Sequence, residues 1–215
     1  MRNPATPEPL VCALMGKRGG ATASWSGAHK GRHLDEKLVV PAGRALRLVV
    51  VADTHGRPHP ASHGLIAALA PDAILHAGDI GSLELLNRLR DIAPTIAVRG
   101  NIDTPAPEVP DTVALRINDD DRAVLTLLLT HIGLTGPRLR ADTARAAGAH
   151  QAAMVVCGHS HVPFIGRDRD LVVFNPGSIG PRRFTLPITF GVIDVSRAKL
   201  DLRHISAETG APWSP

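Results

Sequence analysis

Five short polar clusters, most of them placed directly after an apolar run, constrain the fold of this chain more than any other feature. The clusters are Asp53-Thr54-His55, Gly78-Asp79, Gly100-Asn101, Thr130-His131 and Gly158-His159-Ser160-His161. Four follow strongly apolar runs, and Gly100-Asn101 follows the weaker run 96–98. Strands that end at one edge of a sheet bring the side chains after them together. Because Asp, Asn and His supply oxygen and nitrogen ligands, the pattern predicts a metal site, with two metals favoured.

The length and the charge distribution limit the class of protein. A chain of 215 residues suits one α/β domain with a sizeable core. The net charge is +4, but residues 1–47 hold 8 Lys and Arg against 3 Asp and Glu, while the remainder holds 16 against 17. Tyr is absent, and aromatic residues make up 3% of the chain, few for a protein that stacks bases. Nucleic acid is therefore not expected as a partner.

Cysteine usage and hydropathy predict a protein of the cytoplasm. The two cysteines, Cys12 and Cys157, lie in unlike contexts and imply no disulfide framework. Cys157 ends an apolar run and is expected to be a core thiol. No apolar run approaches the roughly 18 residues needed to cross a membrane, and residues 9–15 are a poor signal-peptide core.

Residues 1–44 are rich in Gly, Ala, Ser, Pro and basic residues and show no periodicity. We expect a disordered basic extension, or a start codon placed too far upstream; a basic arm for an acidic partner is the functional alternative. The regular pattern covers 45–207 and predicts the folded domain. Residues 208–215 are expected to form a tail.

The order of the predicted elements indicates an α/β fold. Strands at 46–52, 73–77 and 95–98 alternate with helices at 63–70 and 82–91, which predicts a parallel sheet. The second half contains one predicted helix, at 138–147. Its predicted strands, several of them paired as hairpins, lie at 112–117, 123–130, 154–157, 164–167, 171–174, 189–195 and 199–205. Two mixed sheets with helices outside, a four-layer α/β/β/α sandwich, accommodate this order.

Any single cluster is weak evidence, because a lone Asp after Gly is usually a turn former and a lone His is usually a core residue. The set, in this order and spacing, resembles the calcineurin-like metallophosphoesterase superfamily. The runs Ala52–Gly56 and His76–Asp79 are similar to those of its small prokaryotic phosphodiesterase branch. So are the single residue between the last two histidines and the later run Asn175–Ser178. The resemblance covers roughly 46–205.

The resemblance implies which residues hold each metal. One metal is assigned Asp53, His55, Asp79 and His161, and the other is assigned Asp79, Asn101, His131 and His159. Asp79 would bridge two divalent ions, and a hydroxide between them would attack phosphorus. Mn²⁺ is expected, with Ni²⁺, Fe and Zn²⁺ left open. Catalysis is expected to involve Asp53, Asp79, Asn101 and His131.

One departure from the family pattern concerns the leaving group. Many larger phosphatases of the superfamily carry Gly-Asn-His-Asp/Glu, where the His helps to protonate the leaving group or to bind phosphate. This chain has Ile102 at that point, and Ile102 cannot transfer a proton. The following Asp103 is either a support for a neighbouring ligand or a solvated turn residue.

Several residues outside the clusters carry weaker expectations. Arg57 and Arg182 are predicted to bind the substrate phosphate, together with Arg183 beside Arg182; a surface Arg pair at 182–183 is equally compatible with the pattern. His76 is expected to be structural. The run Asn175–Ser178 is expected to shape the loop behind the final histidines.

The sequence therefore favours a phosphodiesterase acting on a small phosphoester. A phosphomonoesterase or nucleotide pyrophosphohydrolase is the nearest alternative. A non-catalytic scaffold is another, because a eukaryotic retromer subunit uses the same fold without the full ligand set. A homo-oligomer is left open.

Overall fold

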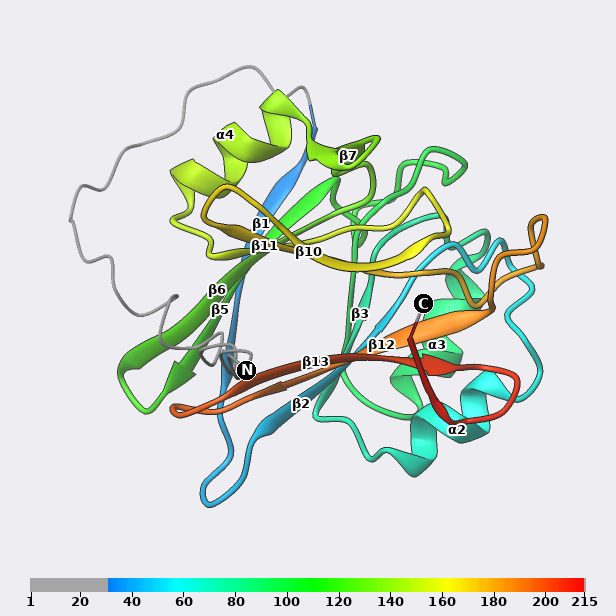
Figure 1. The fold of residues 1–215 in the computed structure, drawn as a ribbon, viewed down its shortest axis with the longest axis horizontal. Helices are drawn as coiled ribbons and strands as arrows, with labels where there is room; N and C mark the ends of the chain where they lie inside the picture. The colour runs from blue at the N-terminus through cyan, green and yellow to red at the C-terminus, as the bar shows by residue number, and fades with distance from the viewer. Residues whose placement is uncertain (1–30, 215) are drawn as a thin grey trace, which may run out of the picture.

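Two six-stranded sheets face each other in the computed structural model, which describes residues 31–214. Figure 1 shows helix α4 (Ala141–Ala149) outside one sheet, and helices α2 (Ser62–Ala68) and α3 (Leu83–Arg90) outside the other. The order of layers is therefore α/β/β/α. This confirms the predicted fold class.

The first sheet has the strand order β1-β5-β6-β9-β11-β10. Its strands are β1 (His33–Val39), β5 (Thr112–Asp119), β6 (Arg122–Thr130), β9 (Met154–Val156), β10 (Pro163–Asp168) and β11 (Leu171–Pro176). β6, β9 and β11 run parallel to one another, whereas β5–β6 and β10–β11 are antiparallel hairpins. The short strands β7 (Leu134–Thr135) and β8 (Arg138–Leu139) form a separate pair before α4.

The second sheet has the strand order β14-β13-β12-β2-β3-β4. Its strands are β2 (Leu46–Val51), β3 (Ala73–His76), β4 (Thr95–Ala97), β12 (Thr189–Val195), β13 (Leu200–Ser206) and β14 (Pro212–Trp213). β2, β3 and β4 are parallel, as the βαβαβ pattern predicts. The carboxyl ends of these three strands consequently lie at one edge.

The two faces of β2 explain its continuous apolar sequence. Leu48 and Val50 belong to the core between the sheets, while Val49 and Val51 pack in the cluster beneath the helices. Successive side chains of a strand point to opposite faces, so a strand covered on both sides must be apolar at every position. This burial fixes the end of β2, and with it the position of the residues that follow.

The prediction of a disordered extension is wrong for residues 33–39, which form β1. This edge strand pairs in parallel with β5, and the rings of His33 and His150 stack with centroids 4.2 Å apart. Most of its side chains are exposed, so backbone pairing holds it without an apolar pattern that sequence reasoning could detect. The expectations for residues 1–30, including Cys12, lie outside the described residues.

The predicted tail at 208–215 also needs correction. Pro212 and Trp213 form β14, which pairs with β13, and the Trp213 ring meets that of His204 edge-on. Cys157 is buried as expected, and burial raises the pKa of its thiol to about 12. Within residues 31–214, no helix has the length and apolar character needed to cross a membrane.

Candidate metal centre

The seven predicted ligand residues meet at one edge of the sandwich. In chain order they are Asp53 and His55 after β2, Asp79 after β3, Asn101 after β4, His131 after β6, and His159 and His161 after β9. β2, β3 and β4 are parallel neighbours in one sheet, and β6 and β9 are parallel neighbours in the other. Parallel strands that end together deliver the residues after them to a common crevice.

Hydrogen bonds beyond the strand ends hold the loops in register. The backbone N–H of Asp53 donates to the carbonyl of Gly78 at 2.9 Å, and that of His55 donates to the carbonyl of Asp79 at 3.0 Å. The backbone pairing of β2 with β3 thus continues into the loops that follow them. Ligand positions in the two loops are fixed relative to each other.

Five of the seven residues have left-handed backbone conformations. Their φ angles lie between 48° and 70°, at Asp53, His55, Asp79, His159 and His161. This region is uncommon for residues other than Gly, although Asp and His are enriched there. Each such residue costs roughly 1–3 kcal/mol, and such strain concentrates at functional sites. The chain therefore turns sharply at each ligand, which aims the side chain into the crevice.

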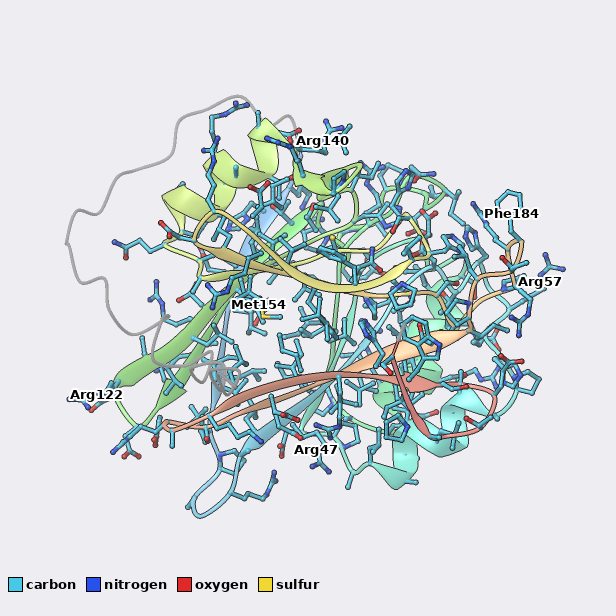
Figure 2. The ribbon with its side chains drawn as sticks, in the orientation of Figure 1. Arg47, Arg57, Arg122, Arg140, Met154 and Phe184 are labelled. Carbon is cyan, nitrogen blue, oxygen red and sulfur yellow. The ribbon has the colours of Figure 1, made fainter. Side chains whose placement is uncertain are left out.

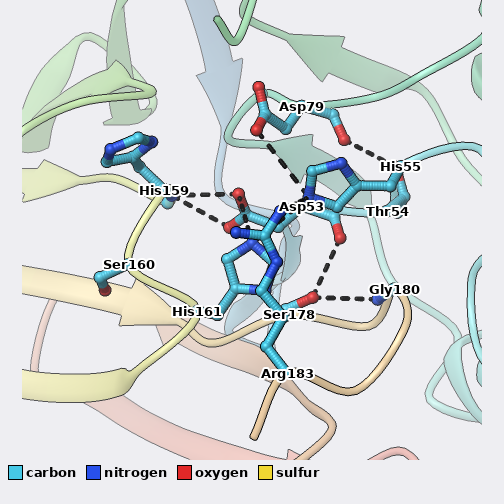
Figure 3. Close-up of polar contacts among 12 residues, drawn as sticks. Asp53, Thr54, His55, Asp79, His159, Ser160, His161, Ser178, Gly180 and Arg183 are labelled. Carbon is cyan, nitrogen blue, oxygen red and sulfur yellow. Dashed lines mark hydrogen bonds and ion pairs between the residues drawn. The ribbon is translucent and has the colours of Figure 1, made fainter. Parts of the chain in front are cut away.

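The first cluster of side chains, the Asp53 group, consists of Asp53, His55 and His161. Nε2 of His161 lies 3.4 Å from Oδ1 of Asp53 and 3.3 Å from Nε2 of His55. The backbone N–H of His159 donates to both carboxylate oxygens of Asp53, at 3.2 and 3.0 Å (Figure 3). One donor atom from each residue converges on a common point suited to a cation.

The second cluster, the Asp79 group, consists of Asp79, His131 and His159, with Asn101 beside it. Nδ1 of His131 donates to the carbonyl of Ala77 at 2.7 Å, because a carbonyl can only accept. Its Nε2 then lies 3.2 Å from Oδ1 of Asp79 and 3.1 Å from Oδ1 of Asn101. Two oxygen acceptors and an imidazole nitrogen thus face one point, an arrangement that a cation or a proton on Nε2 stabilises.

Asp79 lies between the two groups. Its Oδ1 faces His131, and its Oδ2 lies 3.9 Å from Nε2 of His55 in the Asp53 group. The two oxygens of one carboxylate therefore serve different groups. This is the position that a ligand common to two ions has to occupy.

Burial shifts the pKa values of the site in both directions, because it opposes charge on every group: it lowers the pKa of His55, His159 and His161. Burial raises the pKa of Asp53 to about 7, against the effect of His131, and the nearby Asp79 adds to the rise. Burial alone would lower the pKa of His131, but its hydrogen bond to Asp79 and the charge of Asp53 outweigh burial and raise it. Nδ1 of His161 is buried without a hydrogen-bond partner among the described residues. These residues fit a divalent cation, which would balance the buried carboxylates.

His76 has the structural role expected from the sequence. Its Nδ1 accepts the backbone N–H of Gly78 at 3.2 Å, so its Nε2 carries the proton and donates to Oγ1 of Thr54 at 3.0 Å. The Thr54 hydroxyl donates in turn to the carbonyl of Ile80 at 2.8 Å. Complete burial lowers the pKa of His76 to about 4. A neutral His76 therefore ties the loop after β2 to the loop after β3.

Asp103 supports the ligand loops rather than lying free in a turn. One carboxylate oxygen accepts the N–H groups of Gly100 at 2.8 Å and Ile80 at 3.1 Å, and the other accepts that of Gly81 at 2.9 Å. These bonds join the loop after Asp79 to the loop that carries Asn101. Of the two alternatives for Asp103, the structure favours the supporting role.

The run Asn175–Ser178, which begins at the end of β11, backs the final histidines, as expected. The amide of Asn175 donates to the carbonyl of Gly158 at 2.8 Å and to the hydroxyl of Ser160 at 3.1 Å. The hydroxyl of Ser178 donates to the carbonyl of Asp53 at 2.9 Å (Figure 3). These residues hold the backbone of both ligand loops and lie outside the donor set itself.

Close approach requires glycine at Gly78 and Gly100. A Cβ on Gly78, where φ is +89°, would lie 2.6 Å from Nδ1 of His131. A Cβ on Gly100 would overlap the backbone and carboxylate of Asp79. Glycine before each ligand thus allows the loops to approach as closely as the cluster needs.

Arg182 and Arg183 have different partners in the structure. Arg182 pairs with Glu208 at 2.6 Å and donates to the carbonyl of Leu186, so it is engaged away from the ligands. Arg183 instead extends among the ligand side chains (Figure 3), with Nη2 3.2 Å from Nε2 of His55. Arg57 is exposed at the same end of the molecule as Phe184 (Figure 2). Side-chain direction on an irregular loop leaves no sequence pattern, so adjacent arginines cannot be told apart in advance.

Comparison with known proteins agrees with this geometry. Residues 46–198 match the model of the calcineurin-like phosphoesterase superfamily domain. The chain belongs to this superfamily. A probable metallophosphoesterase of Methanothermobacter thermautotrophicus is 32% identical over 76% of this chain and 92% of its own length. Phosphodiesterase YfcE of Escherichia coli is 29% identical over 52% of this chain and only 59% of its own length.

A solved structure supports the fold. Vacuolar protein sorting 29 of Cryptosporidium parvum superposes with a TM-score of 0.65 at 18% identity, over 79% of this chain and 95% of that one. Membership of the calcineurin-like superfamily supports a phosphoesterase, and with the two side-chain groups it indicates divalent-metal binding.

Proposed function

We propose that this chain is a phosphodiesterase that works with two divalent metal ions, one at the Asp53 group and one at the Asp79 group. The observation that carries the proposal is the position of Asp79, whose two carboxylate oxygens face the two groups separately. Two-metal phosphoesterases need such a shared ligand to hold their ions roughly 3.5–4 Å apart.

In this proposal Asp53, His55, Asp79 and His161 hold one ion, and Asp79, Asn101, His131 and His159 hold the other. Mixed oxygen and nitrogen donors suit Mn²⁺, with Ni²⁺, Fe and Zn²⁺ as alternatives. When bound, the ions would supply an activated water and offset the negative charge of the phosphoryl group.

The side chains of this chain position the substrate. Arg183 extends among the ligands, so its guanidinium can donate two parallel hydrogen bonds to phosphoryl oxygens. The hydrogen bond from His131 to Ala77 fixes which ring nitrogen faces the centre. Asp103 and His76 hold the loops that carry these groups.

The presence of Ile at position 102 favours diesters with good leaving groups as substrates. It stands where a proton donor would help an alkoxide to depart, and its side chain cannot donate a proton. An aryl-type leaving group departs without protonation. A diester also brings one less negative charge than a monoester to a site with buried carboxylates.

A non-catalytic scaffold is the alternative that the likeness to vacuolar protein sorting 29 raises. The presence of all seven ligand residues in one crevice favours the enzyme. Substrate profiling separates a diesterase from a monoesterase or a nucleotide pyrophosphohydrolase.

The test is chelation, followed by reloading with Mn²⁺ or Ni²⁺ and assay on bis(4-nitrophenyl) phosphate and 4-nitrophenyl phosphate. We expect no turnover after chelation, recovery on reloading, and a higher kcat/KM for the diester. Ile102→His should raise kcat/KM for the monoester, by about 10²-fold at the low end of general-acid effects. Full activity in metal-free buffer would sink the two-metal proposal. A wild-type preference for the monoester with no gain in the variant would sink the substrate class.

A further inference from the structure

A cavity of about 240 Å³ opens beside the Asp79 group. Its walls are the segments 80–83 and 102–106, together with Val109. The first segment begins one residue after Asp79, and the second begins one residue after Asn101. The cavity thus adjoins the metal centre and is built from the same two loops.

Hydrogen bonds link the walls of the cavity to Asp79 and to each other. The backbone N–H of Ile102 donates to Oδ1 of Asp79 at 3.2 Å. Asp103 binds the backbone of both walls, through Ile80 and Gly81 on one side and Gly100 on the other. The cavity is therefore preformed, and its distance from Asp79 is fixed.

The lining selects against charged ligands. Ile80 and Val109 belong to a buried apolar cluster, with Ala106 packed against it. Ser82 and Thr104 are the uncharged polar residues of the lining, and no Lys, Arg or His belongs to the lining drawn from residues 31–214. The one acid, Asp103, already binds three backbone N–H groups. A second phosphate would find no cation here, whereas an apolar ring would find apolar walls.

Two large apolar side chains of the lining remain open to solvent. Leu83 is 45% exposed and Ile102 is 49% exposed. Covering apolar surface is favourable in proportion to the area removed from water. A ligand that seats an apolar group in the cavity would gain from both residues. A cavity of roughly 150 Å³ is known to hold benzene, so the space suffices for an aromatic ring.

We infer that this cavity binds an uncharged aryl group of a phosphodiester whose phosphate lies at the metal centre. This inference rests on the proposed function and narrows its substrate class. Ile102 would then affect the substrate in two ways: it cannot donate a proton to the leaving group, and it supplies apolar surface to the ring. It also disfavours nucleotide pyrophosphates, which would carry a second charged group away from the centre.

The test compares two monoanionic probes, methyl phenylphosphonate and methyl methylphosphonate, which differ only in the aryl group. Binding to the Mn²⁺-loaded protein is measured by calorimetry. We expect the phenyl probe to bind at least tenfold more tightly to wild type. Ala106→Phe fills the cavity and should abolish the difference, while Leu83→Ser, at an exposed position, should reduce it. Ile165→Ser, an exposed apolar residue on β10, is the matched control and should leave the ratio unchanged.

Turnover of methyl 4-nitrophenyl phosphate by wild type distinguishes failure of the aryl site from failure of the proposed function. Turnover with equal binding of both probes overturns the aryl site alone. A phenyl preference that survives in both Ala106→Phe and Leu83→Ser also overturns it, because the ring must then bind elsewhere. Absence of turnover and of binding by either probe overturns the aryl site and the proposed function together.

Discussion

The Asp53 group and the Asp79 group are built alike but balance charge differently. Asp53 and Asp79 follow neighbouring parallel strands and have φ angles of 53° and 54°. Burial raises the pKa of Asp53 to about 7. Burial also opposes ionisation of Asp79, but the hydrogen bonds from His131 and from the Ile102 N–H outweigh it and lower that pKa to about 2. The same residue in the same conformation thus titrates according to its neighbours.

The two carboxylates therefore differ in how far the surrounding residues stabilise their negative charge. The Asp79 carboxylate already has partners that stabilise its charge, whereas the Asp53 carboxylate is fully buried with less compensation. A cation at the Asp53 group would therefore relieve an unbalanced charge. A cation at the Asp79 group would replace the proton that His131 favours there.

The largest separate effect is expected from removing one histidine of each group. His161→Ala should lose the ion of the Asp53 group, and His159→Ala the ion of the Asp79 group. Each should lower kcat/KM by more than about 10²-fold, because losing a ligand exceeds the effect of losing a residue that only orients one. Metal content per chain, measured beside kcat/KM, checks this. If either variant kept both ions, the division into two groups would be wrong.

Asp103→Ala should affect the groups unequally. Asp103 binds the loops that carry Asp79 and Asn101, so its loss should weaken metal binding at the Asp79 group by about 10- to 100-fold. Asp91→Ala, at the end of α3, is the control and should have no effect. Calorimetric metal titration measures both affinities. Equal behaviour of the two variants would contradict the supporting role of Asp103.

Arg183, which contacts His55 of the Asp53 group, and Arg182, which does not, offer a matched pair. Arg183→Ala should raise the KM for a diester about tenfold, since a hydrogen bond from a charged group contributes roughly 1.5–3 kcal/mol. Arg182→Ala should leave KM unchanged, because Arg182 pairs with Glu208. Steady-state kinetics at saturating metal decides between them. A larger effect at Arg182 would show that the loop turns in the opposite sense.

His76 joins the loops of the two groups and gives a pH test. Its pKa is about 4 when folded, below the ordinary histidine value of 6.5, so its contribution to stability is complete above pH 6.5 and is lost as pH falls through 4. The loss should approach about 3 kcal/mol, taking 1.36 kcal/mol for each pKa unit. Urea unfolding of chelated wild type and His76→Gln across this range measures it. Parallel pH profiles would mean that His76 titrates normally.

Buried features of the fold were predictable from the sequence, and exposed ones were not. β2 is covered on both faces, so its apolar run marks both the strand and the ligands at its end. β1 is an edge strand held by backbone pairing, and its exposed side chains carry no pattern. The left-handed conformation of the ligands escaped prediction too, because Asp and His do not require it as Gly often does. The choice between Arg182 and Arg183 depends on a loop whose direction is set by tertiary contacts.

The central claim is that Asp79 joins the two groups into one two-metal centre. Its most direct test is the metal content of Asp79→Ala after chelation and reloading with Mn²⁺, compared with wild type prepared in the same way. We predict two ions per chain in wild type and neither retained in the variant, because each of the two groups loses a carboxylate oxygen. Two ions per chain in Asp79→Ala would contradict the shared ligand and, with it, the two-metal account.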